Sequence, residues 1–158
     1  MILLIKTKKN INKKQFVFTL FIIYCLFLLY ILFLNKNFRN DLRMVNMIPF
    51  ATIQRYINAI KYNYINPLIG FINIGANLFL FVPMGFFVLI LFNKKINNIV
   101  VFFLLNYFII TLIEIIQYIT CTGSADVDDI ILNIIGALFG YVLMKSRIGN
   151  KIIKKFKE

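Results

Sequence analysis

The sequence contains no histidine and no tryptophan, two cysteines, and six acidic residues among 158. Histidine is the usual general base and a frequent metal ligand, so its absence argues against the common hydrolases. Two cysteines without histidine make a poor zinc site. Cys25 lies in the middle of a hydrophobic run, where no oxidant reaches it, and Cys121 lies near the end of another. We therefore expect neither a zinc ion nor a disulfide.

Acidic charge is scarce beside basic charge, because 18 Lys and Arg residues give the chain a formal net charge of +12. The basic residues flank hydrophobic segments, which is typical of topology signals and of contacts with anionic lipid. Hydrophobic residues make up 61% of the chain, and the mean hydropathy is +0.83. A soluble domain is closer to half apolar. Composition therefore predicts an integral membrane protein that contacts membrane lipid and does not bind nucleic acid.

Four hydrophobic segments predict an all-α fold, a polytopic membrane protein built as a bundle of four transmembrane helices. They span about residues 16–34, 71–92, 99–120 and 129–144. The first segment alone reaches about 28 Å as a helix, enough for the bilayer core. The sequence NKNFRN that follows it has no small-residue cleavage site, so we expect this helix to be retained.

The remaining segments carry most of the basic charge. A single transmembrane domain spans residues 16–144. A basic N-terminus, residues 1–15, precedes it, and a basic tail, residues 145–158, follows it. Helical spacing of apolar residues within 35–69 predicts a short amphipathic helix at the outer interface. Thirteen of the 18 basic residues lie in the N-terminus, the 93–98 loop and the tail. The positive-inside rule therefore places both termini in the cytoplasm.

The acidic residues are concentrated at one place. Four of the six lie in the stretch EIIQYITCTGSADVDD, namely Glu114, Asp126, Asp128 and Asp129. Glu114 falls inside the third predicted span, where a carboxylate costs roughly 3 kcal/mol or more. A charge kept at such a position is a functional-site hypothesis by default.

Polar residues of three predicted spans lie at a similar depth. Asn77, Glu114 and Asn133 each lie roughly 6–9 Å inside the outer end of their span, given the rise of a helix. Gln117 shares a helix face with Glu114. Lipid cannot satisfy these groups, so we expect them to face the bundle interior and line one cavity in its outer half.

Small residues and a proline complete the pattern. One stripe of the fourth helix consists of Asp129, Asn133, Gly136 and Gly140. It contains GALFG, a small-xxx-small pattern for close helix packing. Pro83 in the second span is expected to free the carbonyl of Phe79 and kink the helix, and Gly85 is expected to ease the bend.

A packing interpretation of the same residues stays open. Amides and glycines in membrane helices often serve as contacts between helices. Asp126 and Asp128 fit an ordinary polar turn, and Asp129 fits the N-terminus of a helix, where the helix dipole favours a negative charge. This interpretation explains each residue singly, but it does not explain the shared depth, and it explains Glu114 least.

Four segments resemble, in order, the motif blocks of the VanZ-like family, small multi-span membrane proteins named for one associated with teicoplanin resistance. They are NMIPF (46–50), NLFLFVPMGFF (77–87), IEIIQ (113–117) and DVDDIILNIIGALFGY (126–141). The resemblance places on family motif positions Asn77, Pro83, Gly85, Glu114, Gln117, Asp126, Asp129, Asn133 and Gly136. It implies a protein of the bacterial cytoplasmic membrane and cell envelope, linked to antibiotic resistance against glycopeptides such as teicoplanin.

One departure from the family pattern concerns charge. Family members often carry an arginine a few residues before the DxDD segment, whereas CTGSA precedes it here. A basic partner for the acidic cluster then has to come from the outer loop, from Arg39, Arg43 or Arg55.

Three functions are compatible with these residues. The first is a non-enzymatic envelope protein whose outward cavity binds a lipid-linked precursor or a glycopeptide-like ligand. Its candidate ligand-binding residues are Asn77, Glu114, Gln117, Asp126, Asp128, Asp129, Asn133, Arg39 and Arg43.

The second function is an intramembrane metal-dependent enzyme acting on a lipid or envelope precursor. Glu114 is its candidate catalytic acid or base, and Mg²⁺ or Mn²⁺ is its candidate cofactor, with Asp126, Asp128 and Asp129 as metal ligands. The third is proton-coupled transport through Glu114, for which four spans are few. The lack of a complete nucleophilic triad favours the non-enzymatic function.

Overall fold

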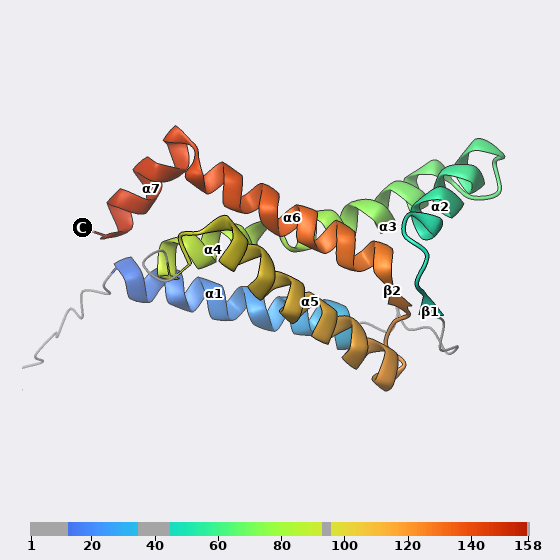
Figure 1. Cartoon of the computed structure of the whole chain (residues 1–158), viewed down its shortest axis with the longest axis horizontal. Helices are drawn as coiled ribbons and strands as arrows, with labels where there is room; N and C mark the ends of the chain where they lie inside the picture. Colours follow the sequence, from blue (N-terminus) through green and yellow to red (C-terminus); the bar gives the residue numbers. More distant parts are fainter. Residues whose placement is uncertain (1–12, 35–44, 93–95, 158) are drawn as a thin grey trace, which may run out of the picture.

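The computed structural model describes residues 13–34, 45–92 and 96–157, and these are almost entirely helical (Figure 1). The elements in chain order are α1 (Lys13–Leu29), the π-helical turn η1 (Tyr30–Leu34), β1 (Val45–Asn46), α2 (Ala51–Lys61), α3 (Pro67–Leu80), α4 (Val82–Phe92), α5 (Ile99–Thr120), β2 (Ala125–Asp126), α6 (Val127–Lys145) and α7 (Arg147–Lys157). Four helical stretches are long and apolar enough to cross a membrane, at Lys13–Leu34, Pro67–Phe92, Ile99–Thr120 and Val127–Lys145. The predicted four-span, all-α fold is therefore confirmed.

Local sequence sets the ends of these helices. Asn98 begins α5, because its side chain accepts a hydrogen bond from the backbone N–H of Val100 at 2.8 Å. Cys121 ends α5 in the left-handed conformation, with φ of 55°. Asp126 begins α6 in the same way as Asn98 begins α5, by accepting from the N–H of Asp128. The fourth span consequently starts at Val127, two residues before the predicted Asp129.

The second span is divided into α3 and α4 at Phe81, close to the predicted bend at Pro83. Pro83 lies in the first turn of α4, where a missing N–H removes no helical hydrogen bond. The carbonyl of Phe79 accepts from the N–H of Phe81, and the hydroxyl of Tyr24 donates to the carbonyl of Leu80 at 2.8 Å. The break therefore leaves these two carbonyls satisfied, and a side chain of the first span contributes.

Helix α6 packs against α3, α4, α5 and α7, so it is the central element of the bundle (Figure 1). The small-xxx-small pattern explains the close approach: a methyl group on Gly136 would overlap the carbonyl of Leu78, and one on Gly140 would overlap the carbonyl of Val82. Gly85 was expected to ease the bend at Pro83. It is buried against the backbone of α6 at Gly140 and Tyr141, where no side chain fits.

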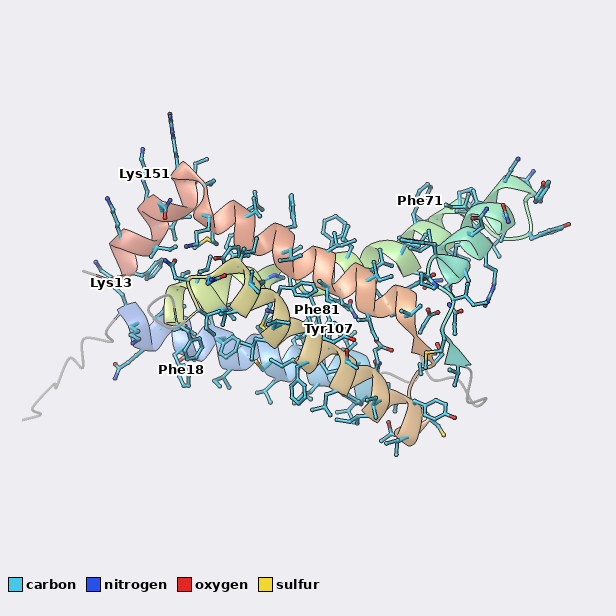
Figure 2. The ribbon with its side chains drawn as sticks, in the orientation of Figure 1. Lys13, Phe18, Phe71, Phe81, Tyr107 and Lys151 are labelled. Carbon is cyan, nitrogen blue, oxygen red and sulfur yellow. The ribbon has the colours of Figure 1, made fainter. Side chains whose placement is uncertain are left out.

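The outer surface of the described helices is largely apolar. Phe18, Phe71 and Tyr107 project away from the bundle, whereas Phe81 lies fully buried among the helices (Figure 2). Such a surface is compatible with lipid rather than with water, as expected for a multi-pass membrane protein.

Most of the basic tail forms helix α7. It packs on α6 and also contacts α1 and α4. Ile153 is buried against the core, while Lys151 points away, and Lys13 of α1 lies at the same end of the molecule (Figure 2). The short amphipathic helix predicted within residues 35–69 is α2.

A polar cavity as the candidate functional site

A two-residue strand pair, which the sequence did not predict, organises the other end of the bundle. β1 and β2 are parallel, with Val45 opposite Ala125 and Asn46 opposite Asp126. Residues 45–61, which we call the docking segment, thereby lie beside the acidic stretch that precedes α6 (Figure 1).

Asp126 has hydrogen bonds on both carboxylate oxygens. Its Oδ1 accepts from Asn46 Nδ2 at 2.9 Å and from the N–H of Asp128 at 2.9 Å. Its Oδ2 accepts from the Thr52 hydroxyl at 2.5 Å, and Thr52 in turn accepts from Asn46 at 3.0 Å. Asp126 therefore begins α6 and binds the docking segment at the same time.

Asp128 caps a helix that lies far away in the sequence. Its carboxylate accepts from the backbone N–H groups of Phe50 at 2.5 Å, Thr52 at 2.8 Å and Ile53 at 3.1 Å. These groups lie at the N-cap and in the first turn of α2, which has no acidic residue of its own. Asp128 is fully buried. A negative charge at this position satisfies the orphan donors of α2 and complements its dipole.

The oxygens of Asp126 and Asp128 are thus occupied by contacts that hold the fold. This is more than the ordinary polar turn considered for these residues, because the partners lie more than 70 residues away. Within the described ranges, no group of three acidic, cysteine or histidine side chains is placed to hold a metal ion. The Mg²⁺ or Mn²⁺ site at Asp126, Asp128 and Asp129 remains a prediction.

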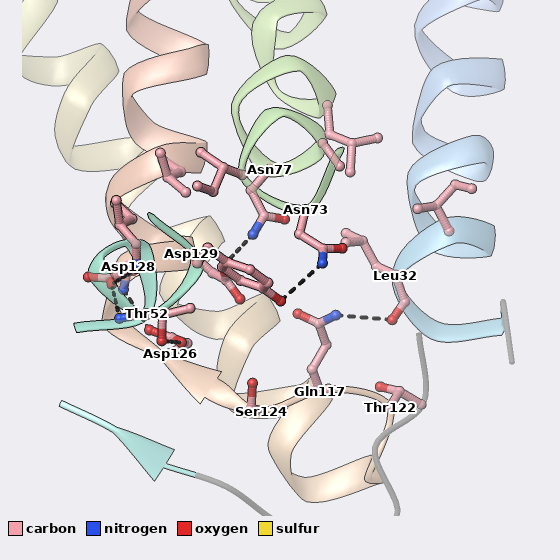
Figure 3. Close-up of a pocket in the computed structure, with 18 residues that line it drawn as sticks. Leu32, Thr52, Asn73, Asn77, Gln117, Thr122, Ser124, Asp126, Asp128 and Asp129 are labelled. Atoms are coloured by element: carbon pink, nitrogen blue, oxygen red, sulfur yellow. Dashed lines mark hydrogen bonds between the residues drawn. The ribbon is translucent and has the colours of Figure 1, made fainter. Parts of the chain in front are cut away.

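A cavity of about 220 Å³ lies between the docking segment, η1, α3 and the start of α6 (Figure 3). Polar residues make up more than half of its lining. They are Thr52, Tyr56, Asn73, Asn77, Gln117, Thr122, Ser124, Asp126, Asp128 and Asp129. The rest of the wall consists of Ile31, Leu32, Ile53, Ile74, Ala76, Leu80, Gly123 and Leu132.

Three amide side chains are fixed around this cavity by contacts between elements (Figure 3). Asn77 of α3 donates to Oδ1 of Asp129 on α6. Asn73 donates to the hydroxyl of Tyr56 at 3.1 Å, and Gln117 donates to the carbonyl of Leu32 at 3.1 Å. The cavity wall therefore ties together α2, α3, α5, α6 and the end of the first span.

Tyr56 has an electrostatic environment that keeps its proton in place. Burial raises the pKa of the Tyr56 phenol above its usual value of 10, and the nearby charge of Asp129 raises it further. The hydrogen bond from Asn73 and the charge of Arg55 act in the opposite direction. The net effect is a higher pKa, so the hydroxyl stays neutral and able to donate.

Glu114 and Asn133 face the bundle interior as predicted, with 5% and 2% of their surface exposed. They are not among the residues that line the cavity, so the predicted common cavity contains Asn77 but neither of these two. Glu114 interacts with the backbone of Asp126 and with the charge of Asp129. Oε2 of Glu114 and Oδ1 of Asn133 are buried without a hydrogen-bond partner among the described residues.

The predicted basic residues of the outer loop are only partly described by the structure. Arg39 and Arg43 lie outside the described residues, so their assignment as ligand-binding residues stays a prediction. Arg55 and Lys61 are exposed on α2. In the part of the chain that the structure describes, no Lys or Arg lines the cavity.

Sequence reasoning missed the contributions of the docking segment, namely Asn46, Thr52 and Tyr56. The segment NMIPF, which begins with Asn46, was the available signal for that residue alone, because a polar residue in a short motif before a helix suggests a specific contact. Asn106 was also missed: it is buried in α5, where its Nδ2 donates to the carbonyl of Phe102 at 2.8 Å.

These features define a four-span membrane protein with a polar, acidic cavity at one end of its helical bundle. The sequence model of the VanZ/LLP1 family matches residues 21–150, which is most of the chain. The protein therefore belongs to the VanZ/LLP1 family, and the resemblance noted in its motifs is confirmed. Comparison with curated proteins and with solved structures gives no match to the chain.

Proposed function

We propose that this VanZ-like protein is a non-enzymatic protein of the cell envelope that binds a lipid-linked or glycopeptide-like ligand in its polar cavity. By this binding it lowers the susceptibility of the cell to teicoplanin. In this proposal the protein resides in a bacterial cytoplasmic membrane with both termini inside, so the cavity opens toward the outer surface. The basic N-terminus and tail support that orientation.

The observation that carries the proposal is the surplus of polar groups around the cavity. Asp126 and Asp128 are used in folding. One side-chain oxygen each of Asp129, Asn73, Asn77 and Gln117 accepts no hydrogen bond from the described residues. Folding alone gains little from such groups in a membrane bundle, where an unsatisfied polar atom is costly. A ligand with several hydrogen-bond donors would satisfy them.

A susceptibility measurement tests the proposal. The wild-type chain and the variants Asn77→Leu and Asp129→Asn are expressed in a teicoplanin-susceptible bacterium without a chromosomal homologue. We expect wild type to raise the inhibitory concentration several-fold and both variants to lose this protection while still reaching the membrane. Arg147→Gln, a charge change on α7 remote from the cavity, is the matched control and should protect like wild type.

Two results contradict the proposal. One is a wild-type protein that reaches the membrane and gives no protection. The other is full protection by both cavity variants at wild-type expression, because the cavity would then have no part in the phenotype.

A further inference from the structure

We propose that the group bound in the cavity is a protonated primary amine, rather than a phosphate or a carboxylate. This inference rests on the proposed function, because it concerns the same cavity, and it names the chemical group that the lining recognises. It follows from which hydrogen-bonding positions the protein has already used.

Each amide around the cavity directs one N–H of its NH₂ group to the protein. Asn77 donates to the carboxylate of Asp129, and Gln117 donates to the carbonyl of Leu32 at 3.1 Å. A carboxylate and a backbone carbonyl only accept, so each amide has to turn its NH₂ group toward its partner. Asn73 likewise donates to Tyr56 at 3.1 Å. The side-chain carbonyl oxygens of these amides therefore remain as acceptors for a ligand.

One carboxylate is also available. Asp126 and Asp128 have hydrogen bonds on both oxygens, from the docking segment and from the start of α6. Asp129 uses Oδ1 to accept from Asn77, while its Oδ2 accepts no hydrogen bond from the residues that the structure describes. Figure 3 shows Asp129 on the cavity wall beside Asn77 and Asn73.

The charges around the cavity are of one sign. Every charged residue in its described lining is acidic. Glu114 lies outside the lining but interacts with Asp129, and its Oε2 is buried without a partner among the described residues. A bound anion would be repelled by this arrangement, whereas a cation would neutralise it.

An alkylammonium group matches the geometry as well as the charge. It has three N–H donors and no acceptor, which suits one carboxylate and several amide carbonyls. A cavity of about 220 Å³ has room for this group and a short alkyl chain. The chain would lie against Ile31, Ile74 and Leu80, which are in the lining.

The test compares three probes that share one alkyl chain. Purified full-length protein in a non-ionic detergent is mixed with hexylamine hydrochloride, hexanol or hexyl phosphate at equal concentrations, and the midpoint of thermal unfolding is measured by circular dichroism. A ligand that binds only the folded state raises this midpoint. We expect a concentration-dependent rise with hexylamine, and no comparable rise with hexanol or hexyl phosphate.

Variants assign the response to the cavity. Asp129→Asn should abolish the rise with hexylamine, and Arg147→Gln on α7 should leave it at the wild-type value. If Asp129→Asn does not fold, Gln117→Leu removes one acceptor and leaves the carboxylate in place. It should weaken the apparent affinity for hexylamine several-fold.

A second arm separates two sources of the amine. Native mass spectrometry is carried out with phosphatidylethanolamine and with its N-acetylated form. Retention of the first lipid alone identifies a lipid headgroup, and a hexylamine response without retention of either lipid identifies a free amine. Both outcomes support the inference.

The inference is overturned if hexyl phosphate stabilises the protein more than hexylamine, or if hexylamine gives no rise in wild type. A hexylamine response that persists in folded Asp129→Asn overturns it too. These results are distinct from failure of the proposed function. Protection against teicoplanin without an amine response removes only this inference, whereas an amine response without protection removes only the resistance function.

Discussion

At the scale of single residues, Glu114 is the side chain that folding explains least. It is 5% exposed inside a membrane span, and one carboxylate oxygen has no partner among the described residues. Glu114→Gln keeps the shape and removes the charge, which eases insertion into the membrane. We expect wild-type expression, unfolding free energy within about 1 kcal/mol of wild type, and loss of protection against teicoplanin. Susceptibility tests and thermal unfolding check both parts.

A well-expressed Glu114→Gln protein that still protects fully would make Glu114 a packing residue. Thr111→Val serves as the control. Thr111 Oγ1, also on α5, is likewise buried without a hydrogen-bond partner among the described residues. This change removes a polar group without altering charge, and it should keep protection.

Phe50 carries backbone strain at the start of α2. Its φ is 66° and its ψ is 2°, a left-handed conformation that a residue with a Cβ adopts at a cost of about 1–2 kcal/mol. Its side chain is 60% exposed, so little packing is lost on truncation. Phe50→Gly should therefore be more stable than Phe50→Ala by about 1 kcal/mol, measured by chemical unfolding. Equal stability of the two variants would show that this φ is not maintained.

Prediction of single residues from the sequence succeeded where the position of a polar residue within one span was enough to predict its burial. Glu114, Asn77 and Asn133 were expected to face inward because lipid cannot satisfy them, and all three are at least half-buried. Sequence reasoning failed for Asp126 and Asp128. Two spans separate them in the chain from their partners Asn46, Phe50 and Thr52. Periodicity carries no information about such a distant contact.

At the scale of elements, the docking of α2 depends on a cap that α2 does not contain. Asp128→Ala would leave the N–H groups of Phe50, Thr52 and Ile53 without an acceptor. Each buried donor left unsatisfied costs about 1–3 kcal/mol, so the docking segment should detach. Limited proteolysis with trypsin should then cut after Arg55 or Lys61, and wild type should resist cleavage at both positions.

Asp129→Asn is the matched control for this experiment, because it leaves all contacts of Asp128 in place. It should resist trypsin like wild type. Equal cleavage of wild type and Asp128→Ala would mean that the cap does not hold α2.

The contact of α6 with α4 gives a prediction with an internal control. A methyl group on Gly140 would overlap the carbonyl of Val82, whereas one on Gly75 would meet only the Phe79 ring, at 3.8 Å. Gly140→Ala should lower the unfolding free energy by about 1–3 kcal/mol through overpacking. Gly75→Ala should be neutral or stabilising by up to about 1 kcal/mol through helix propensity. Equal unfolding midpoints for the two variants would contradict the close packing.

Some features of the helices and strands were predictable from the sequence, and others were not. The four spans and the stripe of Gly136 and Gly140 follow from hydropathy and spacing, so the sequence predicted them. The pair β1–β2 has two residues in each strand, too few for an alternating pattern to be recognised. The contact of Gly85 with α6 was not predicted, because a sequence shows where a glycine lies but not which backbone approaches it.

At the scale of the whole molecule, the property to be measured is the orientation of the protein in the membrane. The basic termini predict a cytoplasmic location for both, so the turn that contains Cys121 should face outward. An impermeant thiol reagent applied to intact cells should label Cys121 more readily than Cys25, which lies within α1. A cysteine introduced at Lys94 should stay unlabelled until the cells are permeabilised. Labelling at position 94 in intact cells would reverse the orientation.

The parallel pairing of β1 with β2 also orders the steps of biogenesis. The acceptors for the first turn of α2 belong to Asp128, which leaves the ribosome after three of the four spans. While those spans insert, the docking segment has no cap and cannot adopt its final position. Closure of the cavity therefore follows the synthesis of the first residues of α6. A nascent chain that ends before α6 would leave the docking segment exposed. This exposure would distinguish an incomplete protein from a finished one.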